Sequence, residues 1–162
     1  MNHVETIGLI SDTHDHLPSI ERAVELFNDR AVDLVLHAGD VVSPFTARAF
    51  GNLEAPFTGV FGNNDGDRVH LQAFFADIGT FHADPYMDDI GGARIAVTHI
   101  PELVPSLAAT QDVVVYGHTH ESMVEDNGAL VVNPGECCGY LSGRHTVALL
   151  SLPGMQADVI EL

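Results

Sequence analysis

Lysine is absent from this chain of 162 residues, tryptophan is absent too, and cysteine occurs only twice. Twenty-three aspartate and glutamate residues face six arginines, which gives a formal net charge of −17. The two cysteines, Cys137 and Cys138, are neighbours, and adjacent cysteines rarely reach relaxed disulfide geometry because the peptide holds their Cα atoms about 3.8 Å apart. We interpret them as two half-buried free thiols in a reducing compartment, since an adjacent pair without a second one is a poor zinc signature.

Long hydrophobic runs are also missing. No apolar stretch approaches the roughly 18 residues of a membrane-spanning helix. The N-terminal segment 1–5 lacks the basic residues of a signal peptide and reaches an acid at Glu5. The hydrophobic content of 46% argues for a compact globule. We therefore expect one domain over residues 1–162, located in the cytoplasm and without a membrane partner.

The acidic, lysine-free composition resembles that of halophilic archaea that accumulate salt in the cytoplasm; the alternative is an ordinary acidic protein. Repulsion between like charges destabilises a compact chain, and it weakens when salt shortens the Debye length to about 3 Å at 1 M. The same charge argues against stable binding to a nucleic-acid backbone. Homo-oligomer formation stays open.

The order of expected elements predicts an α/β protein. Apolar positions at helical spacing predict a helix over 18–30, and a shorter helix is expected at 44–50. The segment 126–128 is typical of a tight hairpin turn. A βαβ-like first half and a strand-rich second half predict two packed mixed β-sheets flanked by helices. Strands are expected at 6–10, 32–36, 58–61, 94–98, 112–116, 122–125, 129–133, 146–152 and 156–160.

Polar clusters follow these strands, at the place where open α/β sheets build their sites. Residues two apart in an extended segment point to the same side, so Asp12 and His14 are expected to converge, as are His118 and His120. Any one of these short motifs alone is a weak signal. The clusters, in chain order, are 12–14 (Asp-Thr-His), 39–40 (Gly-Asp), 62–65 (Gly-Asn-Asn-Asp), 98–99 (Thr-His) and 117–120 (Gly-His-Thr-His).

Together the five clusters resemble the ordered signature of the calcineurin-like metallophosphoesterases, and the match spans Asp12 to His120. The segment 133–143 further resembles the small archaeal and bacterial phosphodiesterase branch (YfcE-like). The resemblance implies a four-layer αββα sandwich and a metal-dependent phosphodiesterase. Its substrate would be a small phosphodiester, attacked directly by a hydroxide that bridges two divalent ions.

Carried over position by position, the resemblance implies two ions and a ligand set. Asp12, His14 and His120 would hold the first ion, and Asn63, His99 and His118 the second. Asp40 would bridge both, and Asp40, Asn64 and His99 count as the catalytic residues. Oxygen and imidazole ligands without thiolate favour Mn, with Ni, Zn, Fe or Co as alternatives.

Asn64 departs from the family pattern, because many relatives carry a histidine there that is placed to protonate the leaving group. An amide donates a hydrogen bond but is no general acid. We therefore predict a preference for good leaving groups, with His16 as the first alternative proton donor. Relatives also often show a second histidine after the one at 99, where this chain has Ile100 and Pro101.

For residues outside the five clusters we expect supporting roles rather than metal ligation. His37 is expected to be packed or to support the ligands, and Arg68 and Arg144 are the nearest cations for a phosphate oxygen. Asn133 and Gly135 would shape the rim of the site, with Phe45 packed there.

Two other classes of protein are weighed against the enzyme. One relative of the family, a retromer subunit, serves mainly as an interaction surface, but a pure scaffold has no reason to keep a complete ligand set. A flavodoxin-like nucleotide binder is disfavoured because no glycine-rich loop follows the first strand.

The composition generates a first prediction, on salt. The melting temperature should rise markedly between dilute buffer and molar KCl, because screening relieves the repulsion between the acidic side chains. Thermal unfolding followed by circular dichroism at both salt concentrations measures this. A flat melting temperature would contradict the halophilic interpretation and leave the enzymatic one intact.

Overall fold

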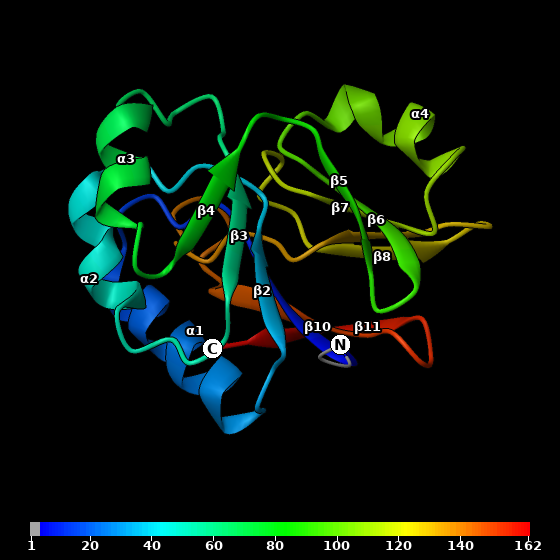
Figure 1. Cartoon of the computed structure of the whole chain (residues 1–162), viewed down its shortest axis with the longest axis horizontal. Helices are drawn as coiled ribbons and strands as arrows, with labels where there is room; N and C mark the ends of the chain where they lie inside the picture. The colour runs from blue at the N-terminus through cyan, green and yellow to red at the C-terminus, as the bar shows by residue number, and fades with distance from the viewer. Residues whose placement is uncertain (1–3) are drawn as a thin grey trace.

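Two mixed sheets form the centre of the computed structural model, which describes residues 4–162 (Figure 1). Residues 1–3, which include His3 and belong to the segment 1–5 that shows no signal-peptide pattern, lie outside the described residues. The six-stranded sheet has the order β11 (Gln156–Glu161), β10 (Thr146–Ser151), β1 (Thr6–Ile10), β2 (Leu34–His37), β3 (Phe57–Val60) and β4 (Gly79–His82). The five-stranded sheet has the order β5 (Tyr86–Ile90), β6 (Ala93–Thr98), β7 (Val113–Tyr116), β9 (Leu130–Asn133) and β8 (Met123–Asp126).

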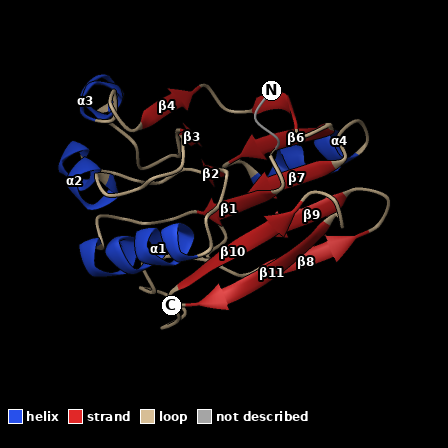
Figure 2. Ribbon diagram, turned by 60° about the horizontal axis from the view of Figure 1, so that its bottom comes forward, coloured by secondary structure: helices blue, strands red, loops and turns tan. Residues whose placement is uncertain are grey.

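Helices cover the outer faces of both sheets. In Figure 2, the first three helices gather on one side of the molecule, and α4 lies beside β6 and β7 on the other. Within residues 4–162 no helix has the length and apolar character needed to cross a membrane. The helices are α1 (Leu17–Asp29), α2 (Ala47–Phe50), α3 (Arg68–Phe74) and α4 (Val104–Ala108), with 3₁₀ turns at Pro44–Thr46 and Pro101–Leu103.

Three hydrophobic layers hold the sandwich together, and β1 shows why. Its Ile7 and Leu9 point into the layer between the two sheets, where they join residues such as Val115. On the opposite face a Cβ at Gly8 would lie 2.8 Å from ring atoms of Phe27 in α1, so glycine lets the helix approach. A third, smaller layer packs α4 on the second sheet. The predicted two-sheet sandwich is confirmed.

Strand direction brings the chemistry to one edge. The strands β1 to β4 run parallel to one another, and so do β6, β7 and β9. Each of β1, β2, β3, β6 and β7 is followed at its carboxyl end by one of the five polar clusters. The parallel strands therefore deliver those side chains to neighbouring loops.

Several predicted elements are confirmed and others were missed. The first helix lies at Leu17–Asp29, and β8 and β9 form the predicted antiparallel hairpin. The second strand begins at Leu34 rather than at residue 32. Four segments escaped prediction because they are short or bury too little to show a period: α3 buries only one side chain, Leu71, α4 has five residues, β4 has four, and β5 is largely exposed.

Candidate metal centre

Asp12, His14 and His120 bring ligand atoms together in what we call the first cluster. The Nε2 atoms of His120 and His14 lie 3.3 and 3.7 Å from Oδ1 of Asp12. All three ligand atoms lie within 4.8 Å of one another, a spacing that suits one metal ion. Oδ1 of Asp12 and Nε2 of His14 are buried and have no hydrogen-bond partner among residues 4–162. Buried polar atoms without partners are rare in proteins, and a cation between them would satisfy both.

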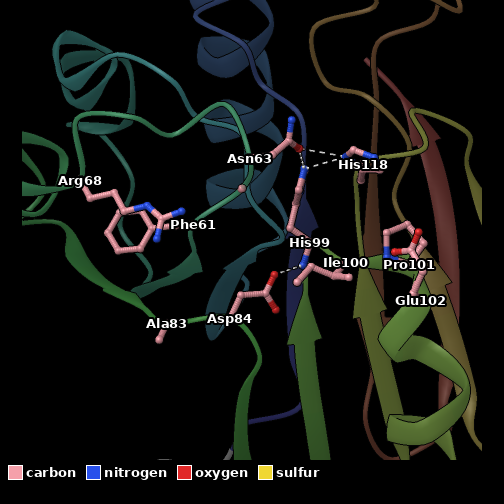
Figure 3. A pocket seen from close by; sticks show the side chains of 11 residues that line it. Phe61, Asn63, Arg68, Ala83, Asp84, His99, Ile100, Pro101, Glu102 and His118 are labelled. Atoms are coloured by element: carbon pink, nitrogen blue, oxygen red, sulfur yellow. Dashed lines mark hydrogen bonds between the residues drawn. The ribbon is translucent and has the colours of Figure 1, made fainter.

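Asn63, His99 and His118 form a second cluster (Figure 3). Oδ1 of Asn63 lies 2.9 Å from Nε2 of His99 and 2.9 Å from Nδ1 of His118. The two ring nitrogens are 3.3 Å apart. On its other side, Nδ1 of His99 donates to the carbonyl of Ala38 at 2.7 Å, since a carbonyl only accepts. This bond leaves the lone pair of His99 Nε2 directed into the cluster.

The carboxylate of Asp40 lies between the two clusters. Its Oδ2 is 3.3 Å from Nε2 of His14 and 3.4 Å from Nε2 of His99. Asn64 donates its backbone N–H to Oδ1 and its side-chain amide to Oδ2, both at 2.8 Å. Burial raises the pKa of Asp40, but the neighbouring imidazoles of His14 and His99 and the hydrogen bonds from Asn64 outweigh burial and hold the pKa well below its usual range.

The pKa of His14, in the first cluster, is shifted in the opposite direction to that of Asp40. The nearby carboxylates of Asp12 and Asp40 raise the pKa of His14 to about 10, although burial alone would lower it. Without a metal ion this imidazole thus carries a proton that offsets the two carboxylates. A cation that occupied the cluster would replace that proton.

The backbone at these residues is not extended, contrary to our expectation for 12–14 and 118–120. Positive φ values occur at Asp12 (52°), His14 (38°), Asp40 (61°), His118 (74°) and His120 (63°). Such left-handed conformations cost on the order of 1–3 kcal/mol each for non-glycine residues and gather at functional sites. The side chains converge because the loops turn sharply, and strand-like alternation plays no part.

Close backbone packing holds the loops in place. A Cβ at Gly62 would collide with the carboxylate and backbone nitrogen of Asp40, and a Cβ at Gly117 would collide with Ser11. The buried carboxylate of Asp65 accepts from the backbone N–H groups of Asp40 (2.9 Å), Val42 (2.7 Å) and Gly62 (2.6 Å). The last acid of the 62–65 motif therefore ties the loops after β2 and β3 together.

Glu136 is the functional residue that the sequence analysis missed. Its side chain is fully buried, and Oε2 accepts from Nδ1 of His120 at 2.6 Å. The same carboxylate accepts from the backbone N–H groups of Leu141 (2.9 Å) and Ser142 (2.5 Å) and from the thiol of Cys138 (3.3 Å). Burial raises the pKa of Glu136, yet these donors lower it to about 2. The bond fixes the proton of His120 on Nδ1 and frees Nε2 for the first cluster.

A signal for Glu136 was present in the sequence. It follows β9, which is parallel to β7, so it obeys the same strand-end rule as the other clusters. The two cysteines beside it are free and fully buried rather than half-buried, and burial raises the pKa of each thiol to about 12. The backbone N–H groups of Cys137 and Cys138 donate to the carbonyls of Ser11 and Asp12.

Three other residues singled out in the sequence, His16, His37 and Arg144, belong to neither cluster. His16 caps the start of α1 by accepting from the backbone N–H of Ser19 at 3.2 Å, and burial lowers its pKa. His37 is fully buried, which lowers its pKa to about 3, and it contacts Thr13 at 3.1 Å. Arg144 pairs with a surface acid, Glu161.

Of the residues expected at the rim of the site, Asn133 and Gly135 are hydrogen-bonded to each other, and Phe45 is largely exposed. Asn133 is buried and donates to Thr119 at 2.9 Å, and it accepts from the backbone N–H of Gly135. Phe45, by contrast, is 49% exposed, so the side chain is not packed at the rim as expected.

This fold and these clusters define a class of two-sheet metallophosphoesterases. A family model, the calcineurin-like phosphoesterase superfamily domain, matches residues 6–154, and the chain belongs to this family. It is 43% identical over 155 residues to phosphodiesterase MJ0936 of Methanocaldococcus jannaschii, with 89% of this chain and 91% of that protein covered.

Solved structures agree with this placement. The structure of an archaeal phosphodiesterase shares 42% identity with the chain and covers 97% of it and 99% of its own length, with a TM-score of 0.90. The YfcE phosphoesterase of E. coli is 21% identical, covers 96% of this chain and 98% of its own, and has a TM-score of 0.67. At that identity the likeness to YfcE concerns the fold alone.

A second prediction follows from Glu136. Glu136→Gln should weaken Mn²⁺ binding by about 10–100-fold, the usual effect of losing a partner that orients a ligand. The carboxylate faces donors only, so one end of the amide would meet another donor. Calorimetric titration of the metal-free protein measures the affinity. Glu125→Gln, an exposed change on β8, is the matched control, and equal affinities in both variants would contradict this role.

Proposed function

We propose that this protein is a phosphodiesterase that works with two divalent metal ions. The observation that carries the proposal is the pair of buried atoms without partners, Oδ1 of Asp12 and Nε2 of His14, beside a carboxylate shared by two ligand clusters. Family membership and 43% identity to a phosphodiesterase over most of both chains support the reaction class.

The first cluster would hold one ion, the second cluster the other, and Asp40 would contact both. Nitrogen and oxygen atoms make up this set, because the thiol of Cys138 is engaged with Glu136. Such a set suits Mn²⁺ best in our proposal, with Ni, Zn, Fe and Co as alternatives. When bound, the two ions would neutralise charge on the phosphate and activate water for attack on phosphorus.

The chain's own residues orient and balance the site. Asp12 and Asp40 bring two negative charges, and neutral imidazoles and the amide of Asn63 bring none. Two divalent ions would therefore leave the site positive despite the charge of −17, which favours an anionic ester. Asn64 directs both its N–H donors at Asp40, so its amide positions that carboxylate rather than a leaving group.

The setting we propose is a cytoplasm rich in salt, and the substrate a small phosphodiester. The acidic composition of the protein disfavours a nucleic-acid backbone as a stable partner. The alternative of an inactive scaffold is disfavoured, because buried, partnerless ligand atoms cost stability that a mere interaction surface has no use for.

A third prediction tests the shared carboxylate. Asp40→Ala should abolish turnover of bis(p-nitrophenyl) phosphate with Mn²⁺ and reduce the bound metal, because Asp40 lies against both clusters. Activity and metal content are measured on the same samples after chelation and reloading. Glu21→Ala, on the exposed face of α1, is the control. Full activity of Asp40→Ala would exclude the proposed mechanism.

A fourth prediction concerns Asn64. Without a general acid, rates should fall steeply as the pKa of the leaving group rises, and an aryl diester should be cleaved about 10²–10⁴-fold faster than an alkyl diester of similar size. Asn64→His should flatten this dependence, and metal content should stay the same because Asn63 is the proposed ligand. Equal rates for good and poor leaving groups in the natural protein would show that another residue supplies the proton.

A further inference from the structure

A cavity of about 530 Å³, which we call the side pocket, opens next to the second cluster. Asn63, His99 and His118 form its inner end, and none of the first cluster's residues lines it. Cavities of this size hold small organic ligands in other proteins. A group bound in the side pocket would therefore lie to one side of the site, connected to a phosphate placed over both clusters.

Phe61 and Arg68 form one wall of the side pocket (Figure 3), and the buried ring of Phe81 lies behind Phe61. The rings of Phe81 and Phe61 stack with centroids 5.1 Å apart and an angle of 17° between them. The guanidinium carbon of Arg68 lies 5.1 Å from the centroid of Phe61. Arg68 therefore already makes a cation–π contact with Phe61, and a ligand ring would approach the guanidinium from the side of the pocket.

The orientation of Arg68 is fixed by the site loop itself. Its Nε donates to the carbonyl of Asp65 at 3.1 Å, and the Asp65 carboxylate accepts from the backbone N–H of Asp40. The guanidinium is thus held by the same residue that ties the cluster loops together. A guanidinium held in this way has already lost much of the freedom that ligand binding would otherwise remove.

The charge of Arg68 is available as well. Arg94 and Arg144 are paired with acidic side chains at 2.7 and 3.0 Å, whereas Arg68 has no such ion pair within the described part of the chain. In a protein with six cations and a net charge of −17, an unpaired arginine at a pocket is informative. The opposite wall presents the apolar side chains of Ile100, which is 42% exposed, and Pro101; the acidic Asp84 and Glu102 also line the pocket.

We propose that the side pocket binds a flat, unsaturated ring on one ester arm of the phosphodiester, and that Arg68 selects the ring by stacking on it. The proposal rests on the proposed function. A stacked guanidinium prefers a π face over a saturated ring of the same size, and Ile100 and Pro101 would cover the ring's other face. The ring belongs to a simple aryl ester or to a nucleoside, which share this chemistry.

Calorimetry on the Mn²⁺-loaded protein in molar KCl tests the proposal with two matched probes, phenylphosphonate and cyclohexylphosphonate. Phenylphosphonate should bind about fivefold more tightly, as expected for one stacking contact. Arg68→Gln should remove this preference, and so should Arg68→Lys, which keeps the charge but loses the plane. Arg94→Gln, remote from the pocket, should retain it.

Equal affinities for the two phosphonates, no binding of either, or a preference that survives Arg68→Gln would overturn the proposal. Thymidine 5′-monophosphate separates the two sources of the ring: tighter binding than phenylphosphonate indicates a nucleoside arm, and weaker binding a simple aryl arm. Turnover of bis(p-nitrophenyl) phosphate, followed in the same samples, reports on the proposed function independently. An inactive protein that still prefers the phenyl ring would refute the reaction and not the pocket.

Discussion

The carboxylate of Asp40 is buried between two groups of imidazoles, and the rest of the site is arranged around it. A buried charge is costly unless polar groups surround it, and here they come from three different loops: the imidazole of His14 after β1, the amide of Asn64 after β3 and the imidazole of His99 after β6. Each of these groups must lie at the right distance to stabilise the buried negative charge of Asp40. The requirement couples the two sheets through one side chain.

The loops that meet Asp40 are held by contacts that the chemistry itself does not use. Asp65 joins the loops after β2 and β3, and the backbone of Cys137 and Cys138 joins the segment after β9 to the loop after β1. These bonds offset the strain of left-handed residues at the ligand positions. The ligand atoms are therefore pre-positioned, which lowers the entropic cost of ordering them when ions bind.

With the two proposed metal ions bound, charge at the site would differ in sign from charge over the whole chain. The protein carries 23 acidic residues, yet Asp12, Asp40 and Glu136 are each committed to imidazole or N–H partners. Arg68, stacked on Phe61, brings a positive charge to the side pocket. Electrostatics over a few ångströms, where screening is weak, decides what binds, while the distant surface acids act on stability and solubility.

The sequence alone determined the two-sheet fold, the family and the side chains of both clusters, because apolar strands and the polar residues that follow them are local patterns. It did not reveal α3, α4, β4 or β5, which are short or bury few side chains and therefore carry little periodicity. Only the tertiary structure decided that Glu136 orients His120, that Asn64 donates to the Asp40 carboxylate, and that Arg68 contacts the ring of Phe61. The first two contacts join residues from separate loops, and their geometry depends on how strands far apart in the chain pack together, whereas Phe61 and Arg68 meet within the one connection between β3 and α3.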